Sequence, residues 1–208
     1  MFTYPTFDVE IIRKVDASDL GWPAAGEAGE ESGLGCNRMY TDLRRLSWAE
    51  ARRVFTLERD LIARIESTAD TEEESAAIEE ELYESGQDLY GLDLGVASTV
   101  ISLSAAKCVP FSSCNGGAFG GQHHEKYPIV AFYAPAQAVE LLIASAEEAD
   151  IGLESNKYLI AYADDIRKIR SFAQSLGSRS SLFNAIRTRR PRRPIPKTRA
   201  AQYPLALE

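Results

Sequence analysis

The sequence predicts an α+β fold in which helices cover one mainly antiparallel sheet. The prediction rests on the order of elements expected from about residue 92 to residue 177, which is helix, strand, strand, helix, strand, strand, helix. The paired strands are joined by turns and not by crossovers, which favours antiparallel pairing. A split-βαβ arrangement is the simplest version of this order.

Local patterns define each element of this 92–177 core. A buried helix is expected at about 94–106, with Asp93 as its cap, because the segment is apolar and rich in small residues. Pro135 suits the first turn of the next helix, and Asp164 or Asp165 caps a last helix that ends at Gly177. Runs of branched and aromatic residues predict four strands, at 109–113, 129–134, 151–155 and 158–163.

Two helices that form a hairpin are expected before this core, over residues 47–86. Ser47 with Glu50, and Thr71 with Glu74, have the spacing of capping boxes. Residues 1–46 form an extended, loop-rich segment with one short strand over 7–15.

Charge separates the C-terminal segment 187–208 from the rest of the chain. The net charge is −8, but residues 1–186 hold 16 basic and 30 acidic side chains, whereas 187–199 hold seven arginines and lysines and no acid. This composition predicts an arm that binds a polyanion or an acidic partner, or that folds back on the acidic body. No aromatic stacking platform is recognised in 92–176, so nucleic acid would bind weakly and without sequence preference. The polyanion-binding candidates are Arg187, Arg189, Arg190, Arg192 and Arg193.

Composition also bears on the compartment. The chain has no apolar run of the roughly 18–20 residues that a membrane-spanning helix needs, and its start lacks the layout of a secretory signal. Three cysteines at irregular spacing are not a disulfide framework. We therefore expect a soluble cytoplasmic protein that does not enter a membrane.

Residues 108–125 (CVPFSSCNGGAFGGQHHE) hold the highest density of reactive groups. One hypothesis makes Cys114 a nucleophile, His123 or His124 its base, and Asn115 a group that orients the histidine or stabilises an oxyanion. Asp164 would join them if the strand ends converge. The glycine-rich turn would bind an anionic ligand through Ser112, Ser113, Gly116 and Gly117. In the alternative reading, Cys114 is a buried structural residue and the stretch only connects two strands.

Two further readings of this stretch fit less well. Zinc is an alternative for Cys108, Cys114 and the histidines, but the spacings C-x₅-C and H-H are not those of zinc sites, so no metal or other cofactor is expected. The glycine pairs match neither phosphate-binding nor dinucleotide-binding motifs.

The element at 112–116 (SSCNG) resembles a short element of the wybutosine-synthesis methyltransferase family of archaea and eukaryotes. Gly117 stands where that element would continue with a basic residue. No function or residue role is carried over from that family.

Two classes of function follow from these patterns, and the sequence does not decide whether the protein is an enzyme. The first is a small-ligand or catalytic pocket at residues 108–125. The second is an accessory or interaction protein that binds a protein partner, another copy of itself, or a polyanion through the basic segment.

Overall fold

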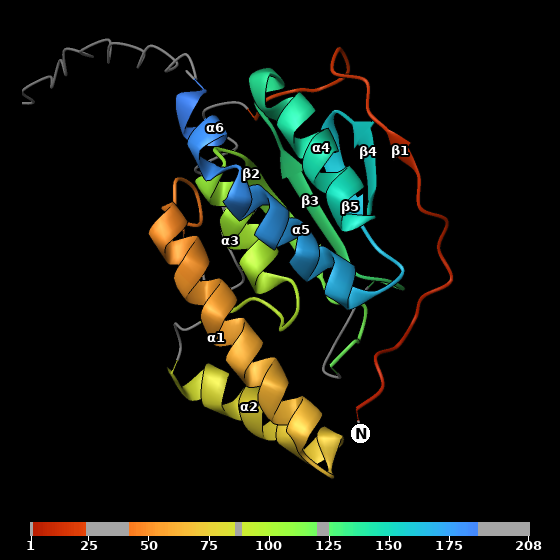
Figure 1. Ribbon diagram of the computed structural model, residues 1–208, viewed down its shortest axis with the longest axis vertical. Coiled ribbons are helices and arrows are strands. Elements are labelled where there is room, and N and C mark those ends of the chain that lie inside the picture. Colours follow the sequence, from red (N-terminus) through yellow and green to blue (C-terminus); the bar gives the residue numbers. More distant parts are fainter. Residues whose placement is uncertain (1, 24–41, 86–88, 120–124, 187–208) are drawn as a thin grey trace, which may run out of the picture.

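The computed structural model describes residues 2–23, 42–85, 89–119 and 125–186, and over these ranges the α+β class is confirmed (Figure 1). The strands are β1 (Arg13–Lys14), β2 (Val109–Cys114), β3 (Ile129–Tyr133), β4 (Gly152–Asn156) and β5 (Tyr158–Tyr162). The helices are α1 (Trp48–Ser67), α2 (Thr71–Ser85), α3 (Ala97–Ala105), the 3-10 turn η1 (Ala136–Ala138), α4 (Val139–Ala149), α5 (Ile166–Ser178) and α6 (Ser180–Ala185).

The strands form one mixed sheet in the order β1-β4-β5-β3-β2. β1 runs parallel to β4, whereas the pairs β4–β5, β5–β3 and β3–β2 are antiparallel. Since β3 and β4 are both antiparallel to β5, they are parallel to each other with β5 between them. The connection from β3 through α4 to β4 is therefore a split βαβ unit.

Helices cover one face of this sheet. α3, α4 and α5 lie in front of the strands in Figure 1, α1 packs on α3 and α5, and α2 packs on α1. Val130 and Phe132 of β3, with Leu159 and Ala161 of β5, are buried in the core under these helices. Among the described residues, no helix is both long and apolar enough to cross a membrane.

The opposite face of the sheet carries the alternate residues of each strand, because neighbouring side chains of a strand point to opposite sides. None of these residues belongs to the main core cluster, and α3, α4 and α5 pack on the other side. We call this surface the helix-free face; its larger apolar and aromatic members are Phe111, Ile129, Tyr133, Tyr158, Ile160 and Tyr162. The pairing also places Val109, Ser112, Cys114, Ala131, Gly152, Glu154 and Asn156 on it.

Two of the predicted helix caps are confirmed. The Ser47 hydroxyl accepts a hydrogen bond from the Glu50 amide at 3.2 Å and starts α1. The Asp165 carboxylate accepts from the Arg167 amide at 2.8 Å and starts α5. Each cap satisfies an amide that the first helical turn leaves without a backbone partner.

Two other predicted caps are wrong. At the start of α2 it is Asp70, and not Thr71, whose side chain accepts from a helix amide, that of Glu73 at 3.0 Å. α3 begins at Ala97, later than the expected 94, and the residue at its cap position is Val96, not Asp93. The amides at the start of α3 donate instead to a side chain of another helix. A local sequence pattern cannot reveal such a contact.

The N-terminal strand and the end of α5 also differ from expectation. Only Arg13 and Lys14 of the range 7–15 form a strand. The Phe7 amide instead donates to the Asp164 carbonyl at 2.8 Å, and the Ile12 amide to the Tyr162 hydroxyl at 3.3 Å. α5 continues through Gly177 to Ser178, because a glycine without strain can remain inside a helix at a modest cost in stability.

Candidate functional site

The stretch 108–125 is described as far as Phe119 and again from Glu125. Its first part is the end of the α3–β2 connection and β2 itself, and a turn follows. His123 and His124, the candidate bases, lie outside the described residues.

Both described cysteines are buried free thiols. Burial raises the pKa of Cys108 far above its usual value, so this side chain stays a neutral thiol at physiological pH. Cys114 closes β2, and its Sγ accepts a weak hydrogen bond from the Gly116 amide at 3.4 Å. Over the described ranges, no three histidine, cysteine, aspartate or glutamate residues gather as metal ligands would.

The turn after Cys114 is held by Asn115, which is buried. Its Nδ2 donates to the Leu94 carbonyl at 3.1 Å and its Oδ1 accepts from the Gly117 amide at 2.8 Å. Gly116 and Gly117 have φ values of +67° and +81°, the region that glycine tolerates best. A Cβ on Gly116 would lie 2.7–2.9 Å from the backbone of Tyr127 and Pro128. The turn is thus fixed to the segment before α3 and to the chain that enters β3.

The two serines before Cys114 lie on a different part of the surface from this turn. Ser112 is exposed and pairs with Ala131 in the sheet, and Ser113 is half-buried and pairs with Val130. The pairing places them on opposite faces of β2. Ser112 therefore lies on the same side as the helix-free face.

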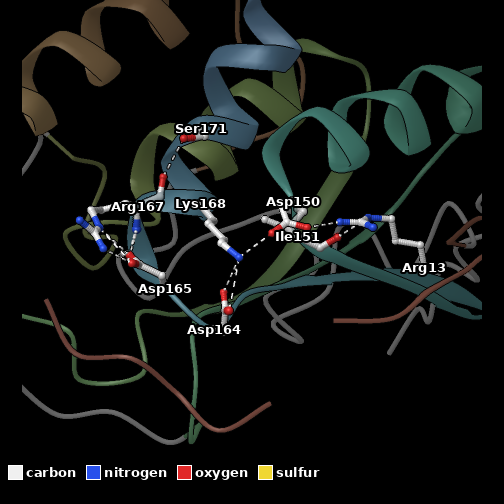
Figure 2. A network of polar contacts seen from close by, with 8 residues as sticks. All are labelled: Arg13, Asp150, Ile151, Asp164, Asp165, Arg167, Lys168 and Ser171. Atoms are coloured by element: carbon white, nitrogen blue, oxygen red, sulfur yellow. Dashed lines mark hydrogen bonds and ion pairs between the residues drawn. The ribbon is translucent and has the colours of Figure 1, made fainter. Parts of the chain in front are cut away.

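Asp164 belongs to a charged network at the end of β5, which Figure 2 shows. Its carboxylate pairs with Lys168 of α5 at 3.0 Å, and Lys168 also contacts Asp150 at 2.7 Å. Asp150, at the end of α4, pairs in turn with Arg13 of β1 at 2.7 Å, and both cations lower the pKa of Asp150. The neighbouring Asp165 carboxylate binds Arg167. The network ties β1, the end of α4 and the start of α5 together.

The sheet register brings the ends of β2 and β5 to the same end of the sheet. Cys114 pairs with Ile129, and Ile129 pairs with Tyr162, the last residue of β5. Two strand spacings, about 10 Å, separate the backbones of Cys114 and Tyr162. Asp164 follows two residues later.

Three aromatic side chains gather at the other end of the helix-free face. The Phe111 ring lies 5.3 Å from the Tyr133 ring and 4.9 Å from the Tyr158 ring, and Tyr133 and Tyr158 are 5.8 Å apart. All three are half-buried. A bulge in β2 makes Phe111 an extra residue between the Pro110–Phe132 and Ser112–Ala131 pairs. We call these three residues the aromatic cluster.

Sequence analysis did not find this cluster and recognised no aromatic platform in 92–176. The three rings come from three strands, and they meet only through the register and the bulge. The one local signal was the alternation in 129–134 and 158–163, which puts Tyr133 and Tyr158 out of phase with the buried Phe132 and Leu159.

The proposed polyanion-binding arginines, from Arg187 to Arg193, lie outside the described residues. Comparison with models of protein families, with curated proteins and with solved structures found no match for this chain.

Proposed function

We propose that this protein is an interaction protein whose helix-free face binds an extended, proline-containing cationic segment of a polypeptide. The observation that carries the proposal is the aromatic cluster of Phe111, Tyr133 and Tyr158, half-buried on the sheet face opposite the helices. Clustered aromatic side chains bind proline-rich segments in several recognition domains, because the extended helix of such a segment is preformed and loses little entropy on binding.

The contacts around the cluster fit such a ligand. Tyr162, at the far end of the face, is buried, and its hydroxyl donates to Glu154 at 2.9 Å and accepts from the Ile12 amide. The N-terminal segment thus contacts the Tyr162 end through Ile12, and its Gly21 amide donates at 2.7 Å to the Lys157 carbonyl beside Tyr158, while the three rings of the cluster are half-buried.

Charge favours a cationic polypeptide over a nucleic acid. Residues 1–186 carry 14 more acidic than basic side chains, and a phosphate backbone is bound by surfaces rich in lysine and arginine. An acidic body attracts arginine and lysine and repels phosphate.

The test is binding of a fluorescein-labelled peptide of alternating arginine and proline, followed by anisotropy with the full chain. We expect saturable binding that Tyr158→Ala weakens at least tenfold, about 1.4 kcal/mol. Tyr83→Ala is the matched control, because Tyr83 is 80% exposed on α2. A peptide with alanine for proline should bind more weakly. Equal binding by the Tyr158 and Tyr83 variants would contradict the proposal.

A second candidate is nucleophilic chemistry at residues 108–125, with Cys114, Asn115 and Asp164 as proposed above. What supports it is the register that puts the ends of β2 and β5 at one end of the sheet. The test is the rate of Cys114 alkylation by iodoacetamide in the full chain, measured by mass spectrometry. A histidine base predicts slower alkylation in His123→Ala or His124→Ala, and equal rates in all three proteins would rule it out.

A further inference from the structure

We infer that the chain's own C-terminal segment, residues 187–208, is the ligand of the aromatic cluster and docks on it within the same molecule. The inference rests on the proposed peptide-binding function and names its ligand. Three observations support it: where the segment starts, what it is made of, and how far it can reach.

The segment starts beside the strand that carries Phe111. Lys107 donates from Nζ to the carbonyls of Asn184, at 3.3 Å, and Ile186. Ile186 is the residue immediately before the segment, and Lys107 lies two residues before β2. Phe111 follows four residues after Lys107, roughly 13 Å along an extended chain. β2 is an edge strand of the sheet, so a segment leaving Ile186 can pass around that edge to the helix-free face.

The composition of the segment matches the proposed ligand. Residues 187–199 combine seven arginines and lysines with Pro191, Pro194 and Pro196, and no acid. Proline rings pack on tyrosine and phenylalanine, and guanidinium groups stack on aromatic rings. The rest of the chain has the opposite charge. The same protein therefore contains both an aromatic surface and a ligand of matching chemistry.

The segment is long enough to reach the aromatic cluster. Twenty-two residues span about 68 Å in the polyproline II conformation, several times the distance to the cluster. Tethering also gives the segment an effective concentration on the order of millimolar, so weak docking is enough to populate the bound state. The docked segment would compete with any proline-rich partner for the same surface.

The experiment is photo-crosslinking in the full chain with p-benzoylphenylalanine in place of Phe111, and in place of Tyr83 as the control. Mass spectrometry then identifies the peptides that are joined. We expect adducts between position 111 and residues 187–208, at the mass of a single chain and at a yield independent of protein concentration, and none from position 83. The absence of adducts between position 111 and residues 187–208, or such adducts only at the mass of two chains, would overturn the inference.

A competition measurement separates this inference from the proposed function. In the full chain with Arg189, Arg190, Arg192 and Arg193 changed to serine, the labelled arginine–proline peptide should bind about tenfold more tightly, because its internal competitor is weakened. If affinity is unchanged but Tyr158→Ala still abolishes binding, the face binds peptides and the internal docking is wrong. If the peptide binds neither protein, the proposed function itself fails.

Discussion

At the scale of single residues, Glu58 joins three helices. This glutamate of α1 is completely buried, and its Oε1 accepts from the Gly95 amide at 2.9 Å, at the start of α3. Its other oxygen accepts from the Ser98 hydroxyl and lies 3.7 Å from Arg170 Nε of α5. Glu58 thus takes the capping role that the sequence assigned to Asp93. Burial raises the pKa of Glu58 despite these donors.

The raised pKa gives a pH-dependent prediction for Glu58→Gln. The folded state holds the Glu58 proton more tightly than the unfolded state, so this group favours folding most below its ordinary pKa of 4.5 and progressively less as pH rises through the folded-state pKa. Glutamine stays neutral. The free energy of unfolding of Glu58→Gln, relative to the natural protein, should therefore rise from pH 4.5 to 7. Urea titrations measure it, with exposed Glu79→Gln as control; parallel curves for Glu58→Gln and the natural protein would refute it.

Two glycines give opposite predictions for the same substitution. A Cβ on Gly152 would lie 2.3–2.7 Å from the Tyr162 ring, whereas a Cβ on Gly177 meets nothing within 4 Å. Gly152→Ala should lower the free energy of unfolding by about 1–3 kcal/mol, because the ring must move. Gly177→Ala should raise it by roughly 0.5–1 kcal/mol, because alanine favours the helix. Chemical denaturation of both variants checks the pair, and changes of the same sign would contradict the packing described.

At the scale of elements, the start of α2 tests which residue is its cap. Asp70 accepts from the Glu73 amide, so Asp70→Ala should cost about 1 kcal/mol of unfolding free energy. Thr71→Ala should change it by no more than a few tenths of a kcal/mol, since alanine favours a helix at least as well as threonine. Thermal and urea unfolding of the two single variants decide whether Asp70 or Thr71 is the cap. A larger loss for Thr71→Ala would restore the capping box that the sequence suggests.

Elements whose signals are local could be predicted from the sequence. Ser47 and Asp165 cap their helices through amides two or three residues away, and the apolar stripe of α1 needs only helical periodicity. Contacts that depend on the tertiary fold could not be predicted from the sequence. A glutamate in the middle of α1 looks like a solvated charge, and only the packed fold shows that Glu58 meets the start of α3.

In the candidate site, too, some residues could be identified from the sequence and others could not. The sequence identified Cys114, Asn115 and Asp164 by residue type, and the structure shows the contacts of each. Asn115 holds two backbone groups, and Asp164 pairs with Lys168. Sequence analysis missed the aromatic cluster because the cluster depends on the pairing of three strands and on one bulge.

At the scale of the whole molecule, the two faces of the sheet are covered differently. Helices cover one face of the sheet, and α1 and α2 extend that layer further (Figure 1). The other face combines apolar and aromatic residues with Ser112, Glu154 and Asn156, and the N-terminal segment meets the sheet at Tyr162 and at Lys157. Sheets with one helix-covered face normally carry polar residues on the other. The aromatic cluster is the part of this face that we propose a ligand covers.

The most direct test of that claim is methyl NMR on the full chain in which Arg189, Arg190, Arg192 and Arg193 are serine, titrated with the arginine–proline peptide. Ile160 lies on the helix-free face, two residues from Tyr158, and Ile62 and Ile101 are buried among the helices. The account predicts that the Ile160 methyl signals shift with peptide concentration and that those of Ile62 and Ile101 do not. Shifts confined to the helical isoleucines, or no shifts at saturating peptide, would contradict it.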